Sequence, residues 1–244
     1  MLVVILPYSL VFLFLSILYI LLEGLQTGQF FPQKEFSLPF LLLIFLKLSP
    51  ALTAFFFILF TKPDWSLFYI LLLITFFFFA LGDLFMEFTK LIGLLSFALG
   101  HLIILSGYIF VLITVNELIY NQVLGFLILA CLLFFLLTIG SFLFLFYLSH
   151  TPFPEKFRHY RFFVYFYAFL LSTHLLTACL LTFILFSTIP GIIVISLGVF
   201  FFIFSDIIIM IREFYFTPSK SVLLIMGPYY LALYLISLQT LFLY

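Results

Sequence analysis

Long apolar runs separated by short polar clusters make up almost the whole chain. The polar or turn-forming clusters lie at residues 23–37, 61–66, 87–91, 116–121, 149–161, 187–190 and 212–220. The runs between them are about 20 residues long, the length of an α-helix that spans a bilayer. They are continuously apolar and do not alternate, so the pattern predicts helices and not the strands of a membrane barrel.

This pattern predicts an all-α fold, an integral membrane bundle of eight transmembrane helices. The predicted spans, with ends good to a few residues, are 2–22, 38–60, 67–86, 92–115, 122–148, 162–186, 190–211 and 221–243. Composition agrees, because 67% of the 244 residues are hydrophobic and 7% are charged, against roughly 45–50% and 25% in soluble domains. The loops are too short to hold a further domain, so the sequence predicts one transmembrane domain over residues 1–244.

The positions of the nine Lys and Arg residues predict the orientation of the bundle. Odd-numbered loops carry seven of them, even-numbered loops carry only Lys62, and the ninth, Lys47, falls inside a span. Cytoplasmic loops are enriched in basic residues. We therefore expect the odd-numbered loops in the cytoplasm and both termini on the opposite side. The formal net charge is zero and suggests no nucleic-acid partner.

Five ionisable side chains fall clearly inside predicted spans, each in a different one: Lys47, Asp83, His101, His174 and Asp206. At 1.5 Å per residue, all five lie in the cytoplasmic half of the bilayer. An Asp at the centre of a membrane helix costs about 2.5–3.5 kcal/mol on insertion scales. We therefore expect the five groups to share one polar cavity, where they satisfy one another. A purely architectural role is the alternative, with either aspartate as the structural partner of Lys47.

Helical spacing predicts which side chains share a face with these groups. Gly198, Phe202 and Asp206 recur at intervals of four, and Gly198 permits the close approach of a neighbouring helix. From spacing alone, Lys47 and His174 fit a structural role better than a chemical one, whereas His101 fits a ligand and a core residue equally. Similar spacing groups His101 with Phe97 and Tyr108, His174 with Tyr167 and Thr177, and Tyr230 with Tyr234 and Ser237.

Three segments together resemble the signature of a known family. They are "ALGDLFMEF" (80–88), "SFALGHLII" (96–104) and "LGVFFFIFSDIIIMIREF" (197–214). Their Gly-Asp, Phe-x-x-Gly-His and Gly…Phe-x-x-Ser-Asp patterns, in this order, resemble the lysoplasmalogenase family of YhhN-like multi-pass membrane proteins. The resemblance extends over about residues 45–240 and includes a second-span lysine at Lys47, a sixth-span aromatic at Tyr167, and paired tyrosines at Tyr229 and Tyr230.

The resemblance implies hydrolysis of the vinyl ether bond of lysoplasmalogens, which releases a fatty aldehyde and a glycerophospho-alcohol. A vinyl ether hydrolyses by protonation of its β-carbon, followed by addition of water, so it needs a protonated acid and a second group that guides water or stabilises positive charge. Burial favours a protonated carboxyl group, and two neighbouring carboxyls ionise at different pH. The resemblance implies Asp83, Asp206 and His101 as catalytic residues, and Lys47, Ser205, Tyr167, Tyr230 and His174 as substrate-binding residues. It implies a lysophospholipid partner and neither a cofactor nor a metal.

Two other functions fit the same residues. A metal-dependent intramembrane lipid hydrolase would need a third histidine ligand, which His150 or His159 of the fifth loop could supply. A proton-coupled transporter would use the buried groups as a relay, although the chain lacks an evident internal repeat and a pair of Gly/Pro-broken helices, both common in carriers. The sequence leaves open the headgroup, the chain length and whether the protein forms a homo-oligomer.

Overall fold

The computed structural model describes residues 2–26, 38–61, 66–119, 161–185, 189–214 and 221–243. Within these ranges it is all-helical and contains seven α-helices long and apolar enough to cross a membrane. Two short 3-10 helices, η2 (Pro190–Ile192) and η3 (Gln239–Leu241), adjoin the last two helices. The α-helices are α1 (Leu2–Gln26), α2 (Leu38–Thr61), α3 (Leu67–Phe88), α4 (Lys90–Ile119), α6 (Arg161–Leu185), α7 (Ile193–Phe214) and α8 (Ser221–Leu238).

Seven of the eight predicted spans therefore correspond to observed helices, and the chain is a multi-pass helical membrane protein. The remaining prediction, a span at 122–148, lies outside the described residues. Most helix ends agree with the predicted ends within a few residues. One difference matters for the site: α3 continues to Phe88, two residues beyond the predicted end, and so includes Glu87.

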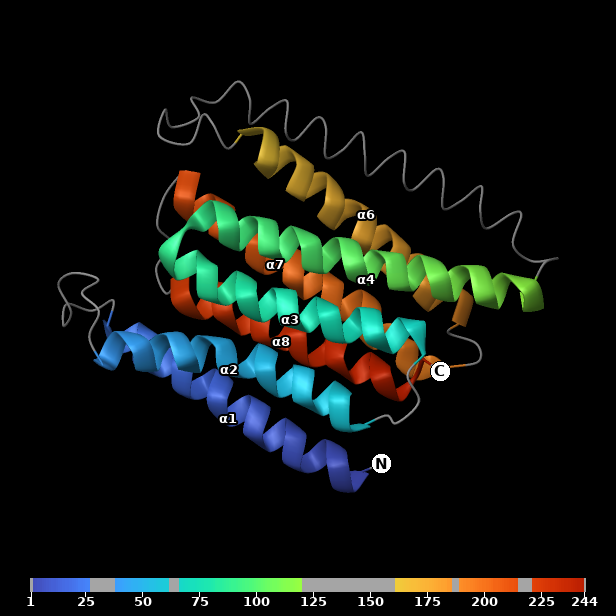
Figure 1. The fold of residues 1–244 in the computed structure, drawn as a ribbon, viewed down its shortest axis with the longest axis horizontal. Coiled ribbons are helices and arrows are strands. Elements are labelled where there is room, and N and C mark those ends of the chain that lie inside the picture. Colours follow the sequence, from blue (N-terminus) through green and yellow to red (C-terminus); the bar gives the residue numbers. More distant parts are fainter. Residues whose placement is uncertain are drawn as a thin grey trace.

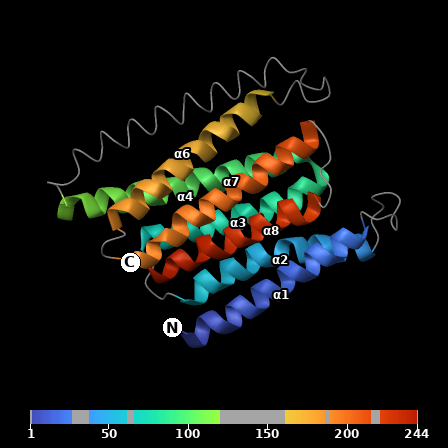
Figure 2. The same cartoon turned by 180° about the vertical axis from the view of Figure 1, so that it is seen from behind.

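The helices form a layered bundle (Figure 1). From α1 to α4, and again from α6 to α8, consecutive helices run in opposite directions, as short connections require. α1 and α2 lie along one side of the bundle and α6 along the other, with α3, α4, α7 and α8 between them (Figures 1 and 2). α3 packs most extensively against α4, and α7 against α8. The two chain ends lie at the same end of the bundle, while α4 ends and α6 begins at opposite ends.

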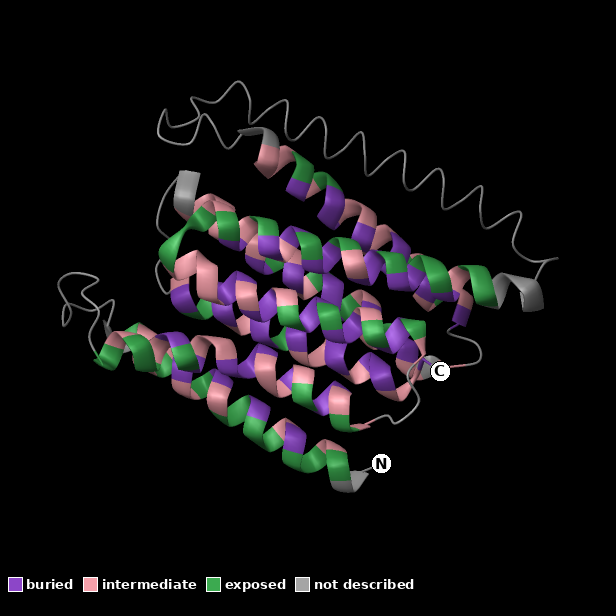
Figure 3. Cartoon of the chain, viewed as in Figure 1, coloured by how far each residue is buried: buried purple, intermediate pink, exposed green. Residues whose placement is uncertain are grey.

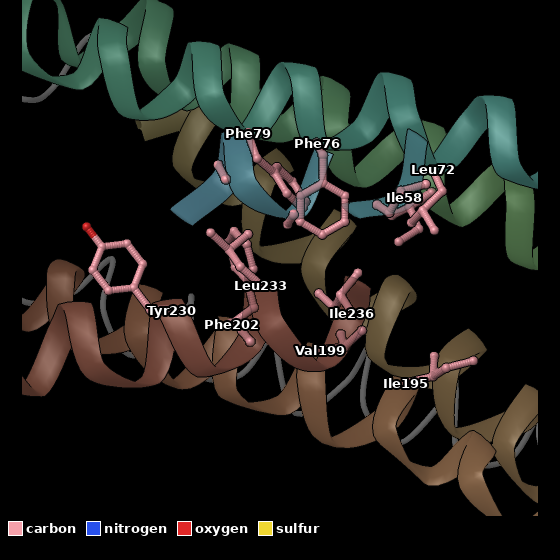
Figure 4. Close-up of a cluster of buried hydrophobic side chains, with 14 of the residues drawn as sticks. Ile58, Leu72, Phe76, Phe79, Ile195, Val199, Phe202, Tyr230, Leu233 and Ile236 are labelled. Atoms are coloured by element: carbon pink, nitrogen blue, oxygen red, sulfur yellow. The ribbon is translucent and has the colours of Figure 1, made fainter. Parts of the chain in front are cut away.

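Apolar side chains fill the interior of the bundle and also cover its outer surface. Buried residues face the neighbouring helices, and large apolar side chains such as Phe60 and Phe183 cover the outer surface (Figure 3). Such a surface is stable in lipid, which is as apolar as the side chains themselves. At the centre, Phe76 and Phe79 of α3 face Phe202 of α7 and Leu233 of α8 (Figure 4).

Glycines permit the closest helix contacts. A Cβ atom at Gly198 of α7 would lie 2.8 Å from Cγ1 and 3.2 Å from the backbone nitrogen of Ile236 in α8. The predicted role of Gly198 in close helix approach is thereby confirmed. Gly82, which precedes Asp83, is similar, because a Cβ there would lie 2.8 Å from the ring of Phe97 in α4.

Pro50 interrupts the hydrogen bonds of α2 next to Lys47. A proline has no N–H to donate to the carbonyl four residues earlier, which here belongs to Leu46. The Ser49 hydroxyl donates to that carbonyl at 2.7 Å instead. Hydroxyl side chains commonly satisfy such carbonyls in membrane helices, so the turn that carries Lys47 remains helical.

Candidate functional site

Each intramembrane aspartate accepts a hydrogen bond from a tyrosine on another helix. Asp83 of α3 is 3% exposed and accepts from the Tyr229 hydroxyl of α8 at 2.7 Å. Asp206 of α7 is partly buried and accepts from the Tyr167 hydroxyl of α6 at 2.8 Å. The predicted site residues Asp206 and Tyr167 are thus in direct contact. A hydrogen bond from a neutral donor satisfies a buried carboxyl group without adding charge.

A cluster of aromatic rings links the two Asp–Tyr pairs. Phe202 lies one turn before Asp206, and its ring centroid is 5.3 Å from that of Tyr229 in an edge-to-face contact. Phe97 contacts both of these rings, at 6.1 Å and 6.0 Å. Tyr229 lies within electrostatic range of both aspartates, and its hydroxyl donates to Asp83. Ring contacts therefore connect Tyr229, the donor to Asp83, with Phe202, one turn before Asp206.

Lys47 forms an ion pair with Glu87, and among the described residues no aspartate pairs with it. Its Nζ lies 2.5 Å from Oε1 of Glu87, and the two side chains are 13% and 24% exposed. The alternative named Asp83 or Asp206 as the structural partner of Lys47, whereas the direct ion pair is with Glu87. Lys47 does act electrostatically on Asp83, which shares its helix face with Glu87. Lys47, Glu87 and Asp83 consequently form a triad of one lysine and two carboxyl groups at this end of the site.

Tyr230 lies on the same side as this triad. Its hydroxyl donates to the backbone carbonyl of Lys47 at 3.4 Å, and its ring meets that of Tyr19 edge-to-face at 5.9 Å. Tyr19 in turn donates to the Glu23 carboxylate, one turn later on α1. Tyr230 thus ties the turn of α2 that carries Lys47 to α8, and among the described residues its hydroxyl bonds this carbonyl and no aspartate.

His101 and His174 pair with each other. Their Nδ1 atoms lie 2.9 Å apart, and both residues are 0% exposed. The rings of Phe79 and Phe202 pack on His101, at 5.1 Å and 4.4 Å, and Tyr108 packs on His174 at 5.4 Å. His101 also meets the ring of Tyr167, the donor to Asp206, at 6.0 Å. Among the described residues, neither imidazole hydrogen-bonds an aspartate.

Ser205, which precedes Asp206, joins two helices. Its hydroxyl is fully buried and donates to the backbone carbonyl of Ile225 in α8 at 2.9 Å. This bond fixes the rotation of α7 against α8 at the turn that presents Asp206. The geometry gives Ser205 a positioning role and leaves its hydroxyl occupied.

A family model described as the YhhN family matches residues 42–240. This chain belongs to the YhhN family. That family includes lysoplasmalogenases. Comparisons with curated proteins and with solved structures returned no match.

Two residues of this YhhN-family site were missing from the residues predicted for it. Tyr229, the donor to Asp83, is the neighbour of the selected Tyr230, and only the rotation of α8 decides which of the two faces α3. Glu87 lies on the last turn of α3, whereas the sequence pattern assigns it to a polar loop cluster. Its spacing of four residues from Asp83 was the signal that could have identified it.

The side chains that the structure of this YhhN-family chain brings together limit where a metal ion could bind. The described ranges contain no group of three or more His, Cys, Asp or Glu side chains that could hold a metal ion. His101 and His174 supply two neighbouring donors, and the third ligand offered by the sequence, His150 or His159, lies outside these ranges. The described residues therefore provide an acid–tyrosine site and only part of a metal site.

Proposed function

We propose that this protein is a lysoplasmalogenase-like hydrolase. It would cleave the vinyl ether bond of alkenyl lysophospholipids and release a fatty aldehyde and a glycerophospho-alcohol. The observation that carries the proposal is the difference between the charge environments of its two Asp–Tyr pairs. Asp83 has the Lys47 ammonium within electrostatic range. Asp206 has the neutral Tyr167 hydroxyl as its hydrogen-bonding partner.

This difference assigns the two halves of the chemistry. A nearby cation favours the ionised form of a carboxyl group, and burial beside neutral partners favours the protonated form. We therefore assign Asp206 as the general acid and Asp83 as the general base. Pairs of carboxyl groups with opposed environments perform these two roles in other hydrolases.

The reaction then proceeds in three balanced steps. Asp206 gives its proton to the β-carbon, and the enol ether becomes an oxocarbenium ion. Water adds to the α-carbon while Asp83 accepts one of its protons, which forms a hemiacetal. The hemiacetal loses its hydroxyl proton to Asp206 and its ether oxygen takes the proton from Asp83, so the C–O bond breaks to aldehyde and alcohol. One water is consumed and both carboxyl groups return to their starting states.

The remaining predicted residues support this chemistry. Tyr167 orients Asp206, Tyr229 orients Asp83, and Ser205 holds the turn that presents Asp206. Lys47 balances charge beside Asp83, and we assign it to the phosphate of the substrate, in the half of the bilayer that the loop charges predict to be cytoplasmic. Tyr230 and His174 act through Lys47 and His101, and His101 packs against Phe202 and Tyr167 at the edge of the site.

The direct test compares three lysophospholipids that differ only at the first glycerol position. The detergent-purified protein is incubated with alkenyl, alkyl ether and acyl forms while fatty aldehyde and free fatty acid are measured. We expect aldehyde from the alkenyl form alone, and its release should persist after chelation of divalent metals. Release of fatty acid from the acyl form, or no aldehyde despite demonstrated binding of the alkenyl lipid, would refute the proposal.

A further inference from the structure

Glu87 and Asp83 compete for one cation. Both lie on α3, one turn apart, so their side chains leave the same helix face. Lys47 enters this face from α2 and places its Nζ 2.5 Å from the Glu87 carboxylate. Asp83 is the more deeply buried of the two acids and takes its hydrogen bond from Tyr229. Glu87, the more exposed acid, therefore forms the ion pair with Lys47, and Lys47 acts on the buried Asp83 through electrostatics without an ion pair.

Within the described part of the chain, few charged groups act on Asp83. The groups that act on it are Lys47 from α2, Glu87 from its own helix and Tyr229 from α8. On the α4 side, the Phe97 ring closes over Gly82 next to Asp83. Two further tyrosines, Tyr230 of α8 and Tyr19 of α1, lie within electrostatic range of its carboxyl group. Lys47 and Glu87 are therefore the oppositely charged side chains that act on Asp83 among the described residues.

We propose that Glu87 is a positioning residue that holds the Lys47 ammonium away from Asp83. An ammonium in direct contact with Asp83 would hold that carboxyl group in its ionised form and make it a poor proton acceptor. With Lys47 bound to Glu87, Asp83 can take a proton from water and return it in the same turnover. The catalytic consequence rests on the proposed function, whereas the electrostatic arrangement does not.

Removal of the Glu87 charge should favour the ionised form of the Asp83 carboxyl group in two ways. In E87Q a negative neighbour disappears, and Lys47 loses its partner and becomes available to Asp83. Both changes favour the ionised carboxyl group. We expect the pH at which Asp83 is half-protonated to fall by about one unit or more, since a contacting opposite charge shifts a carboxyl group by 1–3 units. K47Q should move the same midpoint upward.

The test reads Asp83 directly and needs no turnover. The infrared C=O stretching band of protonated carboxyl groups is titrated with pH, and the Asp83 band is identified as the one missing from D83N. E87D keeps the charge and should restore the wild-type midpoint. E23Q is the matched control. Glu23 is an acid of α1 that accepts a hydrogen bond from Tyr19, and it is not among the groups acting on Asp83. A downward shift in E87Q, absent from E87D and E23Q, is the expected result.

Two outcomes would overturn the inference: an unchanged midpoint in folded E87Q, or an equal shift in E23Q. The pH–rate profile provides the second measurement, in which E87Q should move the acidic limb to lower pH and reduce kcat more than KM. If the wild-type protein releases no aldehyde, the proposed hydrolysis fails, while the infrared midpoints still decide the role of Glu87. The two proposals can therefore fail separately.

Discussion

His101 and His174 face each other through the same ring atom, with 2.9 Å between their Nδ1 nitrogens and no exposed surface on either residue. Two nitrogens at this distance can share one proton, so one ring must donate and the other accept. The neutral pair therefore contains two different tautomers. The donor ring carries its proton on Nδ1, and the acceptor ring carries its proton on Nε2.

This arrangement predicts a specific nitrogen NMR spectrum. In protein labelled with ¹⁵N-histidine, we expect one of the two buried rings as the Nδ1–H tautomer and the other as the Nε2–H tautomer. H101Q and H174Q assign the two sets of signals, and in each variant the remaining ring loses its partner. Two rings with the same tautomer would contradict the hydrogen bond between them.

Replacement of either aspartate by asparagine should abolish nearly all vinyl ether hydrolysis and leave the fold intact. Asparagine has almost the same shape and can still accept a hydrogen bond from Tyr167 or Tyr229. It cannot transfer a proton, and loss of a general acid or base typically costs about 10²–10⁴-fold in rate. Aldehyde release by D83N and D206N measures the effect, with size-exclusion profiles as the check on folding. Near-normal turnover in both variants would make the carboxyl groups structural.

The neighbouring tyrosines of α8 offer a matched comparison. Tyr229 donates to Asp83 at 2.7 Å, whereas Tyr230 donates to a backbone carbonyl at 3.4 Å. A hydrogen bond to a charged group is worth about 1.5–3 kcal/mol and a long neutral one less. We therefore expect Y229F to lower kcat about tenfold or more, and Y230F to have a smaller effect. Equal losses in the two variants would argue that Tyr229 does not orient Asp83.

The helices were predictable because lipid allows few alternatives. A continuous apolar run must satisfy its backbone internally, and a helix does so within one segment. The polar clusters then mark the ends, as for α2, predicted at 38–60 and observed as Leu38–Thr61. The common depth of the five ionisable groups follows from the same counting of residues along each span.

The pairing of those groups was not predictable from the same counting. Depth limits how far a side chain lies along the membrane normal, whereas contact also requires the rotation of each helix and the identity of its neighbours. Adjacent residues such as Tyr229 and Tyr230 differ in direction by about 100° on a helix, so only the packing of α8 selects between them. Glu87 was missed because a charged residue near the end of a span is compatible with both loop and helix.

The orientation of the bundle is testable on a single described helix. Leu67 at the start of α3 and Thr89 just after its end are both exposed and lie at opposite ends of α3. The loop charges predict Thr89 in the cytoplasm and Leu67 on the other side. In a background with Cys131 and Cys179 replaced by serine, L67C should react with an impermeant maleimide added outside intact cells, and T89C only after permeabilisation. The reverse pattern would invert the predicted orientation.

The last prediction concerns the contact between α7 and α8 that holds both sides of the site. A methyl group at Gly198 would meet Ile236 at 2.8 Å on its side chain and 3.2 Å on its backbone nitrogen. Since a backbone atom cannot move aside without moving the helix, α7 must shift, and overpacking of this kind costs about 1–3 kcal/mol. We therefore expect G198A to lower the thermal unfolding temperature in detergent and to reduce activity, because Asp206 lies two turns further along α7.

Gly227 provides the control for this substitution. It lies inside α8, and a methyl group there would meet its nearest neighbour, the Leu223 side chain, at 4.0 Å, an ordinary contact distance. Alanine also favours a helix over glycine by roughly 0.5–1 kcal/mol, so G227A should leave the unfolding temperature unchanged or raise it. If G198A and G227A change stability equally, close packing at Gly198 does not hold α7 against α8, and the rotation of Asp206 toward Tyr167 must depend on the Ser205–Ile225 bond instead.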